Sequence, residues 1–91
     1  MKTYIVICID KKNSLEKRLG NRKMHLDHLR KINEQVVLAG PMMNKNKNPK
    51  GSVLILNFKN KEKLKKFLKA DPYVKVGLFK EITIENFKRV L

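Results

Sequence analysis

The stretch TYIVICI at residues 3–9 decides the fold of this chain. Most of its residues are β-branched or aromatic, which is typical of a β-strand. Successive side chains of a strand point to opposite faces of a sheet. The three isoleucines therefore share one face, and Tyr4, Val6 and Cys8 share the other. Both faces are apolar, so each of them needs a cover.

A second stretch, SVLILNF at residues 52–58, is also apolar in both directions. When helices cover one face of an antiparallel sheet, the other face usually carries polar residues at alternate positions. Here the second face needs an apolar partner, and the simplest one is the same sheet of another copy of the chain, related by a two-fold axis. The sequence therefore predicts a homodimer.

Between these two strands, apolar residues recur with a helical period at Leu15, Leu19, Leu26, Leu29 and Ile32. Asn13 or Ser14 is suited to begin a helix, whereas Gly20-Asn21 is typical of an interruption. We therefore expect a short helical turn over 14–19 and a main helix over 22–34, with Asn21 as its N-cap.

The remaining signals complete the order of elements. Gly40-Pro41 closes a strand, since proline cannot donate to a strand ladder, and Asp71-Pro72 is typical of a helix start. The predicted order is β-α-β-β-α-β, an α+β, ferredoxin-like antiparallel sheet with two helices on one face. The expected later elements are a strand over 35–41, a loop over 44–51, a strand over 52–58, a helix over 60–70, a turn from 71, and a last strand and tail over 78–90.

Length and composition limit the function. A chain of 91 residues makes one domain, 1–91. No stretch reaches the roughly 20 apolar residues of a membrane span, and the opening apolar run is too short for a signal peptide. A single cysteine rules out an internal disulfide framework and fits a reducing compartment. We therefore expect a cytoplasmic protein without a membrane partner.

The net charge of +14 comes mostly from lysines that are spread over nearly every surface segment. A dedicated nucleic-acid site more often gathers arginines and exposed aromatics on one face, whereas the aromatics of this chain occupy core positions of the predicted elements. The composition predicts non-specific electrostatic binding to polyanions at low salt. A basic nucleic-acid-binding module stays open as the least favoured function.

His25 is the residue that suggests chemistry. On a helical projection centred on Leu15, Arg22, His25 and Leu29 lie within the apolar arc, and His28 lies outside it. Imidazole exchanges a proton near neutral pH, so a core-facing histidine with a carboxylate to orient it is the minimum for acid/base catalysis. Arg22 and His25 would then line a cavity beneath the helix. The alternative is a snorkelling arginine and a hydrogen-bonded core histidine.

Other chemistries have weaker signals. His25 and His28 could hold a metal with Asp27, but no cluster of acidic residues or cysteines completes a ligand shell. No glycine-rich phosphate loop or nucleophile elbow is present. We therefore expect neither a metal nor a cofactor. Asp71, taken alone, is explained by helix capping.

Several short motifs occur in order along nearly the whole chain: Arg22-x-x-His25-Leu26, Ala39-Gly40-Pro41, Gly51-Ser52-Val53-Leu54-Ile55 and Asp71-Pro72-Tyr73. In this order and spacing the chain resembles the YciI-like (YCII-related) family. The resemblance implies a dimeric α/β barrel with a His-Asp active site, which maps onto His25 and Asp71. A chlorinated-hydroquinone dehydrochlorinase is among the few activities assigned in that family.

Together these observations predict a small-molecule enzyme that acts by elimination, isomerisation or hydrolysis on a small, anionic organic substrate. His25 would be the general acid/base and Asp71 its orienting partner. Arg22 would hold an anionic group, and Ser52 and Tyr73 would orient the substrate. Pro41 would line the same pocket. The alternative that shares this pocket is a non-catalytic protein that binds a small ligand.

Overall fold

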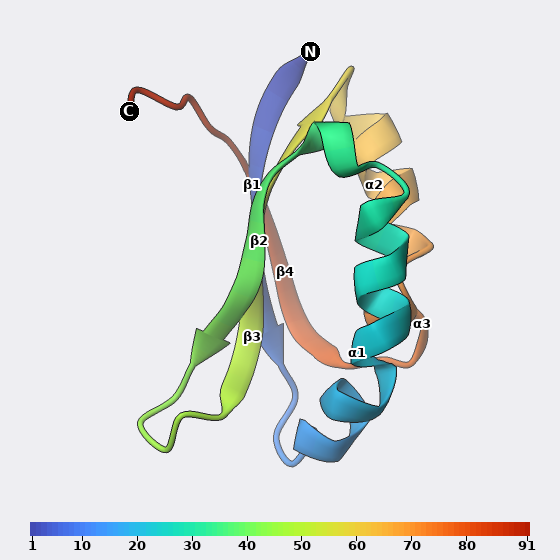
Figure 1. Cartoon of the computed structure of the whole chain (residues 1–91), viewed down its shortest axis with the longest axis vertical. Coiled ribbons are helices and arrows are strands. Elements are labelled where there is room, and N and C mark those ends of the chain that lie inside the picture. The colour runs from blue at the N-terminus through green and yellow to red at the C-terminus, as the bar shows by residue number, and fades with distance from the viewer.

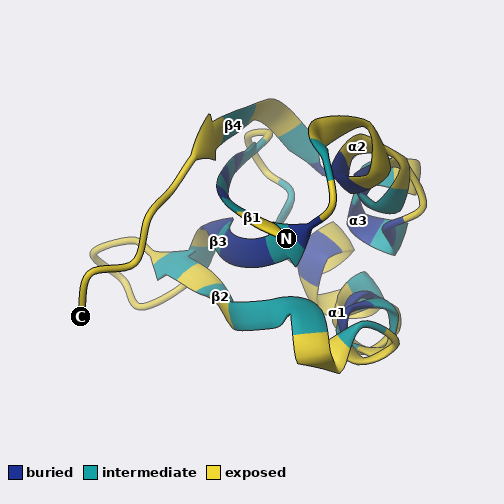
Figure 2. Cartoon of the chain, turned by 90° about the horizontal axis from the view of Figure 1, so that it is seen from above, coloured by how far each residue is buried: buried dark blue, intermediate teal, exposed yellow.

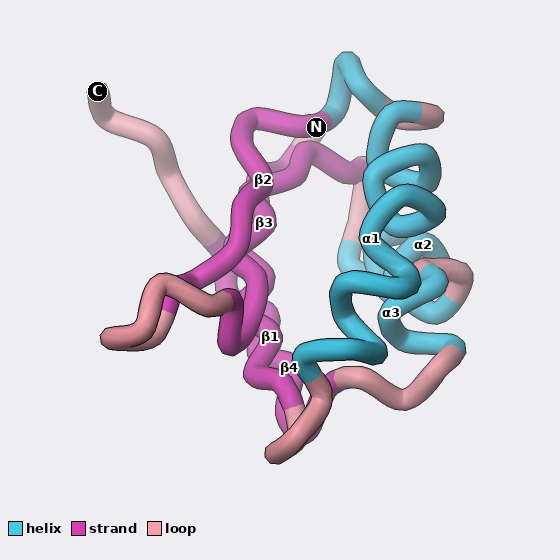
Figure 3. The backbone as a smooth tube through the Cα atoms, turned by 60° about the horizontal axis from the view of Figure 1, so that its bottom comes forward, coloured by secondary structure: helices cyan, strands magenta, loops and turns pink.

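A four-stranded antiparallel sheet forms one layer of the structure, and α-helices packed on one of its faces form the other (Figures 1 and 3). This computed structural model describes residues 1–91. The strand order is β2-β3-β1-β4, and the β-α-β-β-α-β, ferredoxin-like order predicted from the sequence is confirmed. The elements are β1 (Lys2–Asp10), α1 (Leu15–Arg30), a 3₁₀ turn (Asn33–Gln35), β2 (Val36–Met43), β3 (Pro49–Phe58), α2 (Lys61–Lys69), α3 (Pro72–Lys75) and β4 (Phe79–Asn86).

The core lies between the two layers (Figure 2). Alternate side chains of β1 and β3 face the helices and are buried, and Leu29, Leu64 and Leu68 close the core from the helix side. α2 begins at Asn60, whose side-chain oxygen accepts the Lys63 N–H at 2.9 Å. Its leucines point inward at helical spacing and its lysines are exposed, so a strongly basic segment still forms a stable amphipathic helix.

The predicted interruption at Gly20-Asn21 is wrong. α1 is continuous through both residues, and the Asn21 amide donates to the Lys17 carbonyl at 2.8 Å instead of capping a new helix. The two residues still have a consequence, since the first part of α1 lies at an angle to the rest (Figure 1). α1 also ends at Arg30, earlier than predicted, because a 3₁₀ turn precedes β2.

Two loop boundaries also differ from the prediction. The turn after β2 is shorter than the expected loop 44–51, because β3 already begins at Pro49. The Asn44 side chain holds this turn by accepting the N–H groups of Asn46 and Asn48 at 2.9 and 3.1 Å. At the other end, β4 stops at Asn86, so residues 87–91 form a tail outside the sheet.

The face of the sheet opposite to the helices is apolar at its centre. By strand register, the isoleucines of β1 lie beside Val53 and Ile55 of β3, and Leu38 and Met42 of β2 continue the same face. No helix covers this face (Figure 2). We call it the open face. None of the helices is long and apolar enough to cross a membrane.

Candidate active site

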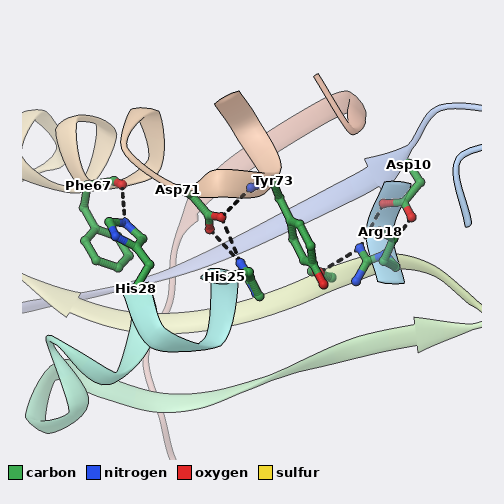
Figure 4. A network of polar contacts seen from close by, with 8 residues as sticks. Asp10, Arg18, His25, His28, Phe67, Asp71 and Tyr73 are labelled. Carbon is green, nitrogen blue, oxygen red and sulfur yellow. Dashed lines mark hydrogen bonds and ion pairs between the residues drawn. The ribbon is translucent and has the colours of Figure 1, made fainter. Parts of the chain in front are cut away.

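His25 and Asp71 meet in the structure, although 46 positions separate them in the chain. The Nδ1 atom of His25 lies 2.9 Å from both carboxylate oxygens of Asp71 (Figure 4). Both residues are buried, with His25 only 5% exposed. The helix α1 therefore presents an imidazole to a carboxylate in a site that excludes most water.

Asp71 is held by the start of α3. One of its oxygens accepts the Tyr73 N–H at 2.9 Å, and Pro72 occupies the first helical position. The capping predicted for Asp71 and its contact with His25 therefore occur together. Because the cap fixes the side chain, the carboxylate is already oriented toward the imidazole.

Tyr73 lies at the centre of the site. Its ring stacks on the His25 ring, with centroids 3.9 Å apart and planes 14° apart. On its other side the guanidinium carbon of Arg18 lies 4.8 Å from the ring centroid. The Phe79 ring lies nearly perpendicular to the Tyr73 ring, with the two centroids 5.9 Å apart. Imidazole, phenol and guanidinium are thus arranged along one line of side chains (Figure 4).

Arg18 was not among the residues singled out from the sequence, yet it is only 4% exposed. Its Nε and Nη2 atoms donate to the two Asp10 oxygens at 2.7 and 2.9 Å, and Nη2 also donates to the Ser52 hydroxyl at 2.9 Å. Burial disfavours the charge of Arg18, but hydrogen bonding to Asp10 and its opposite charge outweigh burial and raise the arginine pKa. Arg18 is therefore a fixed cation.

Two signals in the sequence point to this pair. Arg18 precedes His25 by seven residues, two helical turns, and so shares its side of α1. Asp10 continues the alternation of Tyr4, Val6 and Cys8 toward the helices. Neither signal alone shows that the two side chains form a buried pair, because the strand position and the helix position become neighbours only in the folded chain.

A cavity of about 160 Å³ opens beside these groups, between α1 and the strands β2 and β3. Its polar lining consists of Arg18, Arg22, His25, Ser52 and Tyr73. Leucines of α1 and the Ala39–Pro41 segment supply apolar walls. The cavity thus combines apolar walls with several hydrogen-bond donors, as small-molecule sites commonly do.

Two polar atoms of the site have no partner within the protein. Neither the His25 Nε2 nor the Tyr73 hydroxyl makes a hydrogen bond, and no fully buried side-chain nitrogen or oxygen is left unpaired. Both atoms must therefore reach solvent, which the cavity supplies. Burial raises the Tyr73 pKa, although the charges of Arg18 and Arg22 oppose the shift. The hydroxyl consequently stays protonated near neutral pH and is available as a donor.

The other residues singled out from the sequence have separate positions. Arg22 and Pro41 are exposed and line the cavity, whereas Ser52 is buried and bound to Arg18. His28 does not share a site with His25: its Nε2 lies 2.9 Å from the Phe67 carbonyl oxygen, and its ring stacks on Phe67. No three His, Cys, Asp or Glu side chains are grouped as metal ligands.

Comparison with known proteins gives consistent matches over nearly the whole chain. The model of the YCII-related domain family matches residues 2–88. The chain is 34% identical over 95 residues to Protein YciI from Escherichia coli, and the match covers 96% of this chain and 97% of YciI. An uncharacterized protein from Haemophilus influenzae is 33% identical over 95 residues, and this match also covers 96% of this chain and 97% of that protein.

A solved structure is also similar. 5-Chloro-2-hydroxyhydroquinone dehydrochlorinase (TftG) from Burkholderia phenoliruptrix, solved in complex with 2,5-dihydroxybenzoquinone, matches with a TM-score of 0.89 and 26% identity. The match covers 96% of this chain and 94% of that one. The similarity therefore includes both layers of the fold.

Proposed function

The chain belongs to the YCII-related domain family, and from this premise we propose that it is a small-molecule enzyme in which His25 and Asp71 perform general acid/base catalysis. One observation carries the proposal. The His25 Nδ1 contacts both oxygens of Asp71, while Nε2 is unpaired in a residue that lines the cavity.

This geometry sets the role of each group. Asp71 accepts the Nδ1–H of His25, which fixes the tautomer and leaves the lone pair of Nε2 free to take a proton from a substrate. The carboxylate then stabilises the imidazolium that forms. His25 returns the proton to a leaving group or to a product. This cycle serves an elimination, an isomerisation or a hydrolysis.

The substrate class is a small organic anion. The exposed guanidinium of Arg22, which has no acidic partner, supplies positive charge at the cavity, and the Asp10-paired guanidinium of Arg18 and the Tyr73 hydroxyl line it as further polar groups. A phenolate or carboxylate group suits these donors. The ligand of the TftG structure, 2,5-dihydroxybenzoquinone, supports a single oxygenated ring as the first class to test.

The test measures chloride release from 5-chloro-2-hydroxyhydroquinone and a panel of related ring anions. We expect His25→Ala to lose about 10²–10⁴ in turnover with the fold unchanged, because general acid/base help has that size. His28→Ala is the matched control, since His28 lies on the same helix but binds Phe67 outside the cavity. Turnover at the wild-type rate by His25→Ala contradicts the mechanism. Binding without product, checked by mass spectrometry, favours the non-catalytic alternative.

We also propose that the protein is a homodimer that packs open face on open face. The support is the apolar centre of that face, where Leu38 is half-exposed and the β1 isoleucines are incompletely buried. A two-fold axis would cover both copies at once. Sedimentation at micromolar concentration should show a dimer, and a single monomeric species would contradict this proposal.

A further inference from the structure

The C-terminal tail, residues 87–91 (Phe-Lys-Arg-Val-Leu), carries exposed apolar side chains, and its exposure increases toward its end. Phe87 is 37% exposed, Val90 80% and Leu91 100%. Exposed apolar side chains that lie close together often mark a surface that binds a partner. Val90 and Leu91 therefore present apolar surface that their own chain leaves largely uncovered, whereas Phe87 is partly covered.

The path of the tail leads away from its own sheet. The Phe87 N–H still donates to the Thr3 carbonyl at 3.0 Å, which extends the β4–β1 ladder by one bond. After that point the chain leaves the edge of the sheet on the side opposite to the helices (Figures 1 and 2). It projects into the space in front of the open face, where the second copy of the proposed dimer would lie.

We infer that residues 87–91 are an arm that packs onto the sheet of a second copy of this chain. The inference rests on the homodimer proposed above and adds the element that clasps it. In a two-fold arrangement the contact is made twice, because each arm meets the same surface of the other copy. Phe87, Val90 and Leu91 are then covered in both copies.

The distribution of charge supports a second copy of the chain as the binding partner of the tail. The tail carries Lys88 and Arg89 between its apolar residues. In the register of β4 with β1, the partners of the three β1 isoleucines are Glu81, Thr83 and Glu85, which therefore lie on the open face. This strand thus carries two of the eight acidic residues of a very basic chain on that face. A basic arm therefore finds both an apolar centre and an acidic border on a partner sheet.

The experiment compares dimer dissociation constants by sedimentation. The variant Val90→Asp/Leu91→Asp removes the apolar end of the arm, and its sites lie outside the core, so folding checked by circular dichroism should be unchanged. Met24→Asp is the control, because Met24 is 53% exposed on the helix side and does not line the cavity. We expect the arm variant to raise the dissociation constant by about tenfold or more, and Met24→Asp to leave it unchanged.

The other outcomes separate the two proposals. A dimeric wild type with an unchanged dissociation constant in the arm variant overturns the arm and leaves the homodimer intact. Tighter dimerisation of the arm variant also overturns it, because that result means the tail covers its own open face. A monomeric wild type overturns the homodimer and the arm together.

Discussion

At the scale of single residues, the buried pair of Arg18 and Asp10 has the largest expected effect on stability. Arg18→Met leaves the Asp10 carboxylate buried without its cation, and breaking such a pair costs about 3–5 kcal/mol. Arg22→Met serves as the control, because Arg22 is exposed and makes no ion pair. Urea unfolding measures the free energy of unfolding of the wild type and of both variants.

The double variant Arg18→Met/Asp10→Asn sharpens this test. Removing both charges removes the unpaired carboxylate, so the double variant should be more stable than Arg18→Met alone. An equal loss of unfolding free energy in Arg18→Met and Arg22→Met would show that the Arg18–Asp10 pair contributes little to stability.

Cys8 makes the stability sensitive to alkaline pH. Burial, followed by the negative charge of Asp71, raises the Cys8 pKa from 9.0 to about 12. Because the folded pKa is the higher one, the unfolded chain loses its thiol proton first. The stabilisation is complete below pH 9 and is lost as the pH rises toward 12, by about 1.4 kcal/mol per pH unit.

The measurement is urea unfolding of the wild type and Cys8→Ala at several pH values between about 8 and 11. Cys8→Ala should show a flatter decline above pH 9, since only the raised Tyr73 pKa then contributes at this end of the scale. Identical pH profiles would show that the thiol does not ionise in this way.

In the candidate site, the sequence was informative where one residue carries an unusual signal. A histidine on the apolar side of a helix stands out, and the motif order then pointed to Asp71, whose contact with His25 is present in the structure. Arg18 and Asp10 were not identified from the sequence, because the helical spacing of Arg18 to His25 and the strand alternation at Asp10 place each residue on an inward face without showing that the two form a pair.

At the scale of elements, Gly20 offers a test of the bend in α1. It lies inside the helix, its φ is not positive, and a Cβ at this position would have nothing within 4 Å. Gly20→Ala should therefore stabilise the protein by about 0.5–1 kcal/mol through the unfolded state and helix propensity. Gly51→Ala is the contrasting variant, since its Cβ would clash with the backbone carbonyl oxygen of Cys8.

Thermal unfolding compares the two glycine variants, which should shift the midpoint in opposite directions. A loss of stability in Gly20→Ala would mean that the bend needs the freedom of glycine. The sequence predicted a break here because Gly-Asn is typical of a helix end. The helix continues because its later part is anchored by the burial of His25 and Leu29, which outweighs a weak local preference.

At the scale of the whole molecule, the positive charge is distributed rather than concentrated. The lysines of α2 are exposed on one helix, but others lie in the turn after β2, in α1 and in the tail. Phe87 is the only aromatic among the exposed large apolar residues, so no row of aromatic rings is available for stacking bases. This arrangement favours a solvated basic surface over a nucleic-acid site.

Binding to DNA should consequently be electrostatic alone. Releasing counterions from six to ten phosphate contacts makes affinity fall by about 10³–10⁵ between about 50 and 200 mM salt. We expect a fluorescent duplex to bind at the lower salt and to be lost at the higher, equally for unrelated sequences, while ligands of the α1 cavity keep most of their affinity. A heparin competitor should remove the same signal. Sequence-dependent binding that persists at the higher salt would contradict this view and make nucleic acid the partner that the lysines serve.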